Sequence, residues 1–163
     1  KHLLENGHER ILLVDFDQRL PMYRDRGYVQ AFQEMGRICD EAMILKVPEF
    51  LDGSHAGLIR DAIIKTKPTA ILAVTQKLCE ASISAFTELG LRIYDDISLV
   101  GYDDTVLAQY LGITTIAHPF DEMIEKIADW AALKISDTGT GDVSHIQVKP
   151  FLNIRTSVKN LNA

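Results

Sequence analysis

Short apolar runs alternate with longer segments of helical spacing along most of this sequence, and this alternation constrains the fold more than any other feature. The runs typical of buried strands span residues 11–14, 42–47, 70–74 and 97–100. The segments with helical spacing span residues 21–36, 54–66 and 78–89. Continuous apolar runs are typical of parallel strands buried on both faces, which helices connect by right-handed crossovers. The pattern therefore predicts an α/β fold, an open parallel sheet with helices on both faces.

The alternation becomes less regular after residue 112. A fifth strand, a helix, a flexible loop and two short strands are expected there, in that order. They span residues 113–116, 121–135, 136–141, 146–148 and 151–154. The helix carries the only tryptophan of the chain, Trp130.

Length, composition and charge indicate one soluble domain that does not itself bind nucleic acid. The chain has 163 residues, of which 47% are hydrophobic and 25% charged, as in ordinary globular domains. Binding a nucleic-acid backbone needs clustered Lys and Arg, whereas the net charge here is −6. No apolar run approaches the ~20 residues of a membrane span. Cys39 and Cys79 are far apart and are expected to be reduced thiols in a cytosolic protein.

Polar and aromatic side chains gather where the predicted strands end. They are Phe16 and Asp17 after the first strand, Arg24 at the start of the first helix, Thr75 after the third strand, and Tyr102 and Asp103 after the fourth. Open α/β sheets bind ligands at the carboxyl ends of their strands. Carboxylates and Arg forks match paired hydroxyl groups, and an aromatic ring covers the apolar face of a sugar. These residues therefore predict a site for a sugar or similar polar metabolite.

Simpler interpretations of the same residues stay open. Gly101 followed by two aspartates also suits an ordinary strand-to-loop turn. Arg24 at a helix start could simply pair with Asp25 or Asp15.

Enzyme motifs are missing from the sequence. There is no G-x-G-x-x-G dinucleotide loop, no G-x-x-x-x-G-K phosphate loop and no G-x-S-x-G nucleophile elbow. Residues 11–17 resemble the opening of a response-regulator receiver, but residues 73–76 supply no phosphate-accepting aspartate. The five histidines are scattered, so surface or structural roles are favoured over metal binding. We therefore expect neither an enzyme nor a cofactor or metal.

Six short segments, in order over nearly the whole chain, resemble the effector-binding half of the lactose/galactose-repressor family of bacterial transcription regulators. They are Asn6-Gly7-His8 before the first strand, Arg24-Asp25-Arg26-Gly27-Tyr28, Pro68 to Ala73, Glu88-Leu89-Gly90, Asp95 to Asp104, and Arg155-Thr156-Ser157. The resemblance implies a two-lobed fold like that of periplasmic binding proteins, of which this chain holds mostly the second lobe. Residues 9–112 and 143–157 would form the lobe's core, and the helix at 119–137 would pack on the first lobe.

The resemblance also implies a function. The chain would sense a small-molecule effector as part of a cytoplasmic homodimer, and a separate domain would bind DNA. Arg24 and Asp103 match the family's main effector-binding residues, whereas Thr75-Gln76 replaces the usual Asn-Asp after the third strand. The pocket is therefore altered, and no particular effector is implied. The alternative is an extracytoplasmic solute-binding protein of a transporter, which shares the two-lobed fold.

Overall fold

Six strands form a mixed sheet at the centre of the structure, in the order β2-β1-β3-β4-β5-β6. The computed structural model describes residues 1–17, 24–49, 55–136 and 147–163. The strands are β1 (Ile11–Asp17), β2 (Ile44–Pro48), β3 (Ala70–Ala73), β4 (Ser98–Tyr102), β5 (Thr114–Ala117) and β6 (Phe151–Asn153). The first five run parallel, and β6 pairs antiparallel with β5 at one edge. The predicted open parallel sheet is confirmed, with one antiparallel strand added.

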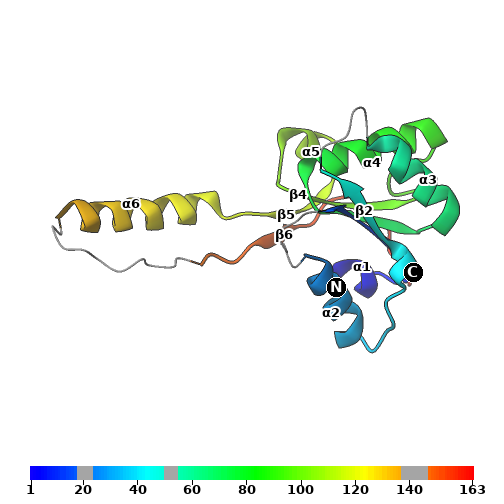
Figure 1. Cartoon of the computed structure of the whole chain (residues 1–163), viewed down its shortest axis with the longest axis horizontal. Coiled ribbons are helices and arrows are strands. Elements are labelled where there is room, and N and C mark those ends of the chain that lie inside the picture. Colours follow the sequence, from blue (N-terminus) through cyan, green and yellow to red (C-terminus); the bar gives the residue numbers. More distant parts are fainter. Residues whose placement is uncertain (18–23, 50–54, 137–146) are drawn as a thin grey trace.

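Helices cover both faces of this sheet, as predicted. The helices are α1 (His2–Glu5), α2 (Arg24–Glu34), the 3-10 helix η1 (Glu41–Met43), α3 (Ala56–Thr66), α4 (Gln76–Leu89), α5 (Val106–Tyr110) and α6 (Phe120–Ser136). Figure 1 shows α3, α4 and α5 on one face of the sheet and α1 and α2 on the other. Because β1 to β5 run parallel, their carboxyl ends lie at the same edge of the sheet, between these two helical layers.

The core lies on both sides of the sheet because the central strands are covered twice. Leu12, Leu13 and Val14 are all 0% exposed. Successive side chains of a strand point to opposite faces, so such a run stays buried only when helices cover both. Phe86 and Leu78 of α4 and other large residues complete the core.

Helix α4 begins two residues earlier than its predicted start at Leu78. The hydroxyl oxygen of Thr75 accepts a hydrogen bond from the Leu78 backbone N–H at 3.2 Å, so Thr75 caps the helix. Gly90 ends the helix in the left-handed conformation, with a φ of +67°.

The predicted second strand was wrong at its start. Residues 42 and 43 lie in η1, and β2 begins at Ile44. The cause is Asp40, whose side chain accepts a hydrogen bond from the Ala42 N–H at 2.9 Å and so starts a helical turn.

The predicted strand at 146–148 was wrong for Gln147 and Val148, which lie in no strand; residue 146 lies outside the described residues. The pairing of β5 with β6 ends at Ala117 and Phe151, so in the described part of the chain the residues before Phe151 have no strand beside them. Three other expectations fall on residues that the structure does not describe: the first turn of the helix at 21–36, the start of the helix at 54, and the loop at 136–141 beyond its first residue. The prediction of a loop was wrong for that first residue, Ser136, which is the last residue of α6.

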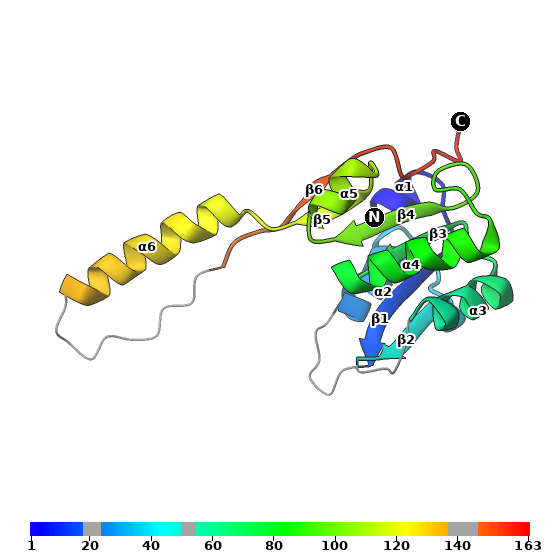
Figure 2. The same cartoon turned by 90° about the horizontal axis from the view of Figure 1, so that it is seen from above.

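Helix α6 projects away from the sheet and its helical layers (Figures 1 and 2). Ile124, Ile127 and Trp130 are 62%, 55% and 40% exposed. The helix therefore does not cover its own sheet, and its packing on a first lobe stays a prediction. None of the helices in the described ranges has the length and hydropathy needed to cross a bilayer.

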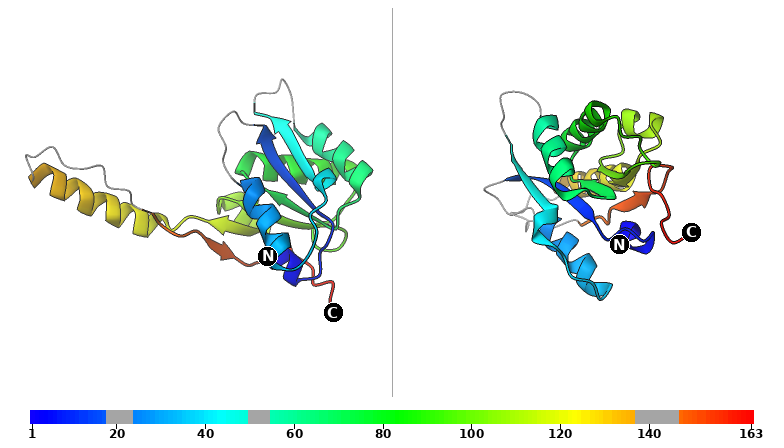
Figure 3. Two further views of the ribbon diagram at one scale, coloured as in Figure 1. Left: turned by 60° about the horizontal axis from the view of Figure 1, so that its bottom comes forward. Right: turned by 90° about the vertical axis from the view of Figure 1, so that its right-hand side faces the viewer.

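The two ends of the chain lie side by side (Figure 3). Leu161 donates its backbone N–H to the Asn6 carbonyl at 2.8 Å, and Asn162 donates its side-chain amide to the Glu5 carbonyl at 2.8 Å. The buried His8 ring donates from Nε2 to the Lys159 carbonyl at 3.0 Å. The segment after β6 thus returns across the sheet to the turn that precedes β1.

Candidate ligand-binding site

Asp103 is held in an unusual backbone conformation directly after β4. Its φ is +61°, in the left-handed region that Asp adopts more readily than most residues other than glycine. Its N–H donates to the Ile116 carbonyl at 3.0 Å, which ties it to the neighbouring strand β5. A residue held in this region is a candidate for a functional role, because its surroundings must offset the strain.

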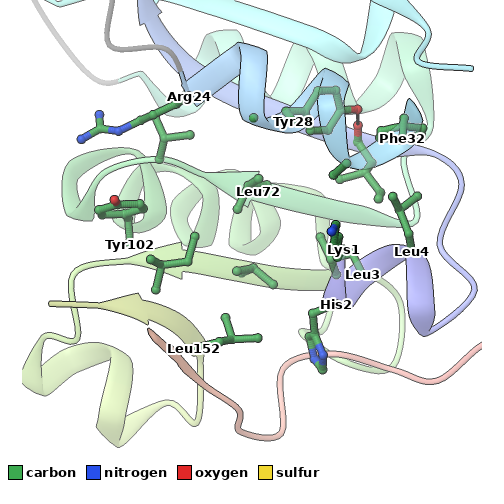
Figure 4. Close-up of a pocket in the computed structure, with 16 residues that line it drawn as sticks. Lys1, His2, Leu3, Leu4, Arg24, Tyr28, Phe32, Leu72, Tyr102 and Leu152 are labelled. Carbon is green, nitrogen blue, oxygen red and sulfur yellow. Dashed lines mark hydrogen bonds between the residues drawn. The ribbon is translucent and has the colours of Figure 1, made fainter. Parts of the chain in front are cut away.

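Arg24 and Tyr102 lie against each other at the same edge. The guanidinium carbon of Arg24 is 4.9 Å from the centroid of the Tyr102 ring, which is a cation–π contact. Figure 4 shows the two side chains together at one end of a groove. Tyr102 immediately precedes Asp103, so α2 and the end of β4 lie together at this edge. Contact of these side chains with a ligand stays a prediction.

His118 joins this group, although the sequence favoured a surface or structural role for it. Its Nε2 lies 3.6 Å from Oδ1 of Asp103. Its ring meets Tyr102 edge-on at 5.5 Å and Phe120 at 5.9 Å between centroids. The available signal was its position just after the fifth strand, at the edge where the other candidates were sought.

The remaining predicted site residues have mixed surroundings. Phe16 is 8% exposed, and its ring packs edge-on against His55 at 5.5 Å between centroids. Thr75 accepts the hydrogen bond that caps α4. Asp17 is the exposed last residue of β1. All three stand at the carboxyl edge, but Phe16 and Thr75 already have structural partners.

Asp104 has a different role from its neighbour Asp103. Its carboxylate accepts hydrogen bonds from Arg155 at 2.7 and 2.9 Å, from Thr115 at 2.7 Å and from Asn153 at 2.8 Å. The hydrogen bonds from Arg155, above all, lower the pKa of Asp104 to about 2. Asp104 therefore links the end of β4 to β5 and β6, whereas the Asp103 carboxylate lies beside His118.

Arg24 is not the cation that pairs with the acidic residues near it. Lys46 pairs with both Asp15 and Asp25, with Nζ–Oδ2 distances of 2.8 and 3.2 Å. Lys46 therefore takes the role that the simpler interpretation gave to Arg24, pairing with Asp15 and Asp25. The Arg24 side chain instead lies over Tyr102.

A largely apolar groove of about 350 Å³ runs from Arg24 and Tyr102 along one face of the sheet to Lys1 and His2 (Figure 4). Its walls come from β1, β3, β4, β5, β6, α1 and α2, and include Tyr28, Leu72, Val74, Val100 and Leu152. Within the described residues, no group of three or more His, Cys, Asp or Glu side chains could hold a metal ion. Arg24 and Tyr102, at one end of the groove, can supply charged hydrogen bonds and an aromatic surface to an uncharged ligand. Asp103, the next residue of the chain, lines a small separate hollow with Gln76 and Thr105.

A family model described as "Periplasmic binding protein-like domain" matches residues 1–158. The chain belongs to this family. Among curated proteins, it is 31% identical over 170 residues to the HTH-type transcriptional repressor PurR of Photobacterium profundum, covering 99% of this chain and 49% of that protein. It is 35% identical over 129 residues to the HTH-type transcriptional regulator DegA of Bacillus subtilis, covering 76% of this chain and 37% of that protein. The chain thus spans about half the length, or less, of these relatives.

Solved structures of similar proteins share the fold. The repressor ascG of Escherichia coli superimposes with a TM-score of 0.79 at 22% identity, over 97% of this chain and 58% of that one. A LacI-family regulator of Enterococcus faecium with bound ribose gives 0.79 at 21%, over 98% and 60%. The complex of the regulator CelR with cellobiose gives 0.79 at 24%, over 96% and 49%. The resemblance to the effector-binding half of lactose/galactose-repressor regulators and the periplasmic-binding-protein-like fold are both confirmed.

Proposed function

We propose that this member of the periplasmic binding protein-like family is the ligand-sensing part of a bacterial transcriptional regulator. The observation that carries the proposal is that Arg24 lies over Tyr102, the residue before Asp103, at the carboxyl edge of the sheet, in a chain whose curated relatives are HTH-type repressors and regulators. Those names favour regulation over the alternative of delivering a solute to a transporter, and they are not names of enzymes.

The ligand is a sugar or a similar polar metabolite. The Asp103 carboxylate accepts two hydrogen bonds from neighbouring hydroxyl groups, and the Arg24 guanidinium donates two in a fork. The Tyr102 ring covers an apolar sugar face beside them. Ribose and cellobiose in two proteins of the same fold support this class of ligand. Phe16, Asp17 and Thr75 line the adjacent part of the edge.

Ligand binding changes DNA binding by a separate domain of the longer protein. The ligand sits between this lobe and a second one and shifts the balance between two arrangements of the lobes. Residues 9–112 and 143–157 belong to the lobe described here, and the helix at 119–137 packs on the other. The protein works as a cytoplasmic homodimer in which α4 and the residues around Tyr110 and Leu111 contribute to the subunit interface. Tyr110 is 86% exposed, which supports its place on such a surface.

A thermal-shift screen of the longer protein tests the proposal. Ribose, cellobiose and other mono- and disaccharides are added one at a time, because a ligand that binds the folded state raises Tm. We expect at least one sugar to raise Tm in the native protein and not in the Asp103→Ala or Arg24→Ala variant. An Asp95→Ala variant, changed in the exposed pair with Arg92, should respond as the native protein does. A sugar response that survives in both site variants would overturn the site.

A further inference from the structure

Asp15 carries a buried carboxylate at the end of β1 that the proposed site does not use. Its side chain is 4% exposed. Its Oδ1 accepts a hydrogen bond from the Phe16 N–H at 2.8 Å, and its Oδ2 accepts one from Lys46 Nζ at 2.8 Å. A buried charge is costly unless it is paired and hydrogen-bonded, and here both conditions are met.

The register of the sheet places Lys46 beside Asp15. Asp15 of β1 and Lys46 of β2 are directly paired positions in the two parallel strands, so their side chains leave the sheet on the same face. That face carries α2 (Figure 1). The Lys46 ammonium reaches past the sheet to the first turn of α2, where it lies 3.2 Å from Oδ2 of Asp25.

Lys46 thereby joins two carboxylates from different layers, one in the sheet and one in the helix. Asp25, Tyr28 and Phe32 follow one another at spacings of three and four residues, so they share one face of α2. Tyr28 and Phe32 are buried against the sheet, and the Tyr28 hydroxyl donates to the Ile11 carbonyl at 2.6 Å. Packing of Tyr28 and Phe32 on the sheet thus fixes the middle of α2, and the ion pair of Lys46 with Asp25 fixes its first turn. The hydrogen bond from Lys46 also keeps the pKa of Asp25 below its ordinary value.

Arg24 is the residue next to Asp25, at the first position of α2. Its guanidinium carbon lies 4.9 Å from the centroid of the Tyr102 ring. Tyr102 belongs to β4, which β3 separates from β1 in the sheet. A small rotation of the first turn of α2 would carry a side chain as long as that of Arg24 several ångströms from this ring, because the displacement grows along the side chain.

We propose that Lys46 is a positioning residue for the ligand-binding edge. By pairing with both Asp15 and Asp25, it fixes the orientation of the first turn of α2, so that Arg24 lies over Tyr102. The proposal rests on the proposed function where it makes Arg24 a ligand-binding residue. The alignment itself is a property of the free protein.

The experiment is an NMR measurement on the full 163-residue chain without ligand. Protons over an aromatic ring are shifted upfield, so the Arg24 Hδ signals should lie upfield of their position in a Tyr102→Leu variant. Contacts between Arg24 Hδ and the Tyr102 ring protons should appear as cross-relaxation peaks. We expect Lys46→Met to lose most of the upfield shift and these peaks, and Lys46→Arg to keep both, since Arg also bridges two carboxylates.

Asp25→Asn separates alignment from stability, because it leaves the buried pair of Lys46 with Asp15 intact. We expect it to displace the Arg24 signals as Lys46→Met does, while the core methyl signals of Ile71 and Leu99 stay in place. Lys126→Met is the matched control, since Lys126 forms an exposed pair with Glu122 on α6, and it should leave Arg24 unchanged.

Full retention of the Arg24 shift and peaks in Asp25→Asn would overturn the proposal, even if Lys46→Met failed to fold. The proposed function can fail separately. If both variants displace Arg24 but no sugar raises Tm, the positioning role of Lys46 stands and the assignment of a sugar ligand is wrong.

Discussion

His118 and Asp103 face each other at the carboxyl edge of the sheet, with Nε2 of the histidine 3.6 Å from Oδ1 of the aspartate. His118 stands between β5 and α6, so the pair connects the candidate site to the base of the projecting helix. The Tyr102 ring completes the contact, 5.5 Å from the imidazole between centroids. A ligand that engages Asp103 would therefore act directly beside the segment that leads to α6.

Replacing Asp103 by alanine should weaken the response to ligand. Loss of a hydrogen bond to a charged group costs ~1.5–3 kcal/mol, or roughly tenfold or more in affinity. Titration of the longer protein with the sugar found in the screen measures this loss. DNA binding without ligand should stay at the native level, and an equal loss of both activities would point to a folding defect instead.

Replacing Asp104 by asparagine should remove stability in a pH-dependent way. The native pKa of Asp104 is about 2, below the ordinary value of 3.8. The ionised carboxylate therefore stabilises the folded state fully at a pH above 3.8. This contribution is lost as pH falls through 3.8 toward 2. Urea unfolding should show the variant about 1–2 kcal/mol less stable at pH 7, with the difference shrinking toward pH 2. Asp61→Asn, at an exposed pair on α3, is the control, and a difference that does not depend on pH would contradict the assignment.

Two glycine substitutions should act in opposite directions. Gly112 has a φ of +66°, and a Cβ there would lie 2.5 Å from the Thr156 hydroxyl oxygen, so Gly112→Ala should destabilise by about 1–3 kcal/mol. Gly27 lies inside α2, and a Cβ there would meet nothing within 4 Å, so Gly27→Ala should stabilise by up to about 1 kcal/mol. Chemical denaturation of the two variants beside the native chain decides the signs.

The isolated chain should self-associate. Ile124, Ile127 and Trp130 on α6 and Val106 and Tyr110 on α5 leave apolar side chains exposed, and monomers seldom leave large apolar patches uncovered. Light scattering should therefore give a mass above that of one chain. Ile127→Glu and Tyr110→Glu then show which helix forms the contact. A monomer whose Trp130 fluorescence is shielded from a quencher would mean that α6 folds back on its own sheet.

The isolated chain should not bind duplex DNA. Its net charge is −6, and binding to the phosphate backbone requires clustered positive charge. Fluorescence anisotropy with labelled duplexes at low and physiological salt tests this expectation. Tight binding that weakens steeply with salt would show that the DNA-binding surface lies within these residues.

Local patterns predicted the layers of this protein because each depends on residues close in sequence. The run Leu12-Leu13-Val14 could be recognised as a strand covered on both faces without knowledge of its neighbours. Arg24 could be placed at the carboxyl edge of the sheet because it begins the helix that follows a parallel strand.

Other features depend on pairing between distant residues and could not be predicted in this way. The bond between Lys46 and Asp15 follows from the register of β1 with β2, which the sequence does not state. Asp103 and Asp104 look alike in the sequence, and the strands that bring Arg155 to Asp104 assign them different roles. The misplaced start of β2 has a local cause, the Asp40 side chain, which competes with strand formation for the Ala42 N–H.

The hydrogen bonds between the two ends of the chain affect how the sheet can fold during synthesis. Lys159, whose carbonyl accepts the hydrogen bond from the His8 ring, is made after β6. So is Leu161, which bonds to Asn6. Closing so long a loop costs entropy before its contacts form, and contacts of this range slow folding. While residues 157–162 are still in the ribosome, the turn before β1 lacks its hydrogen bonds to residues 159–162. A chain arrested at this stage should be more sensitive to protease at residues 5–10 than a chain in which residues 157–162 have folded.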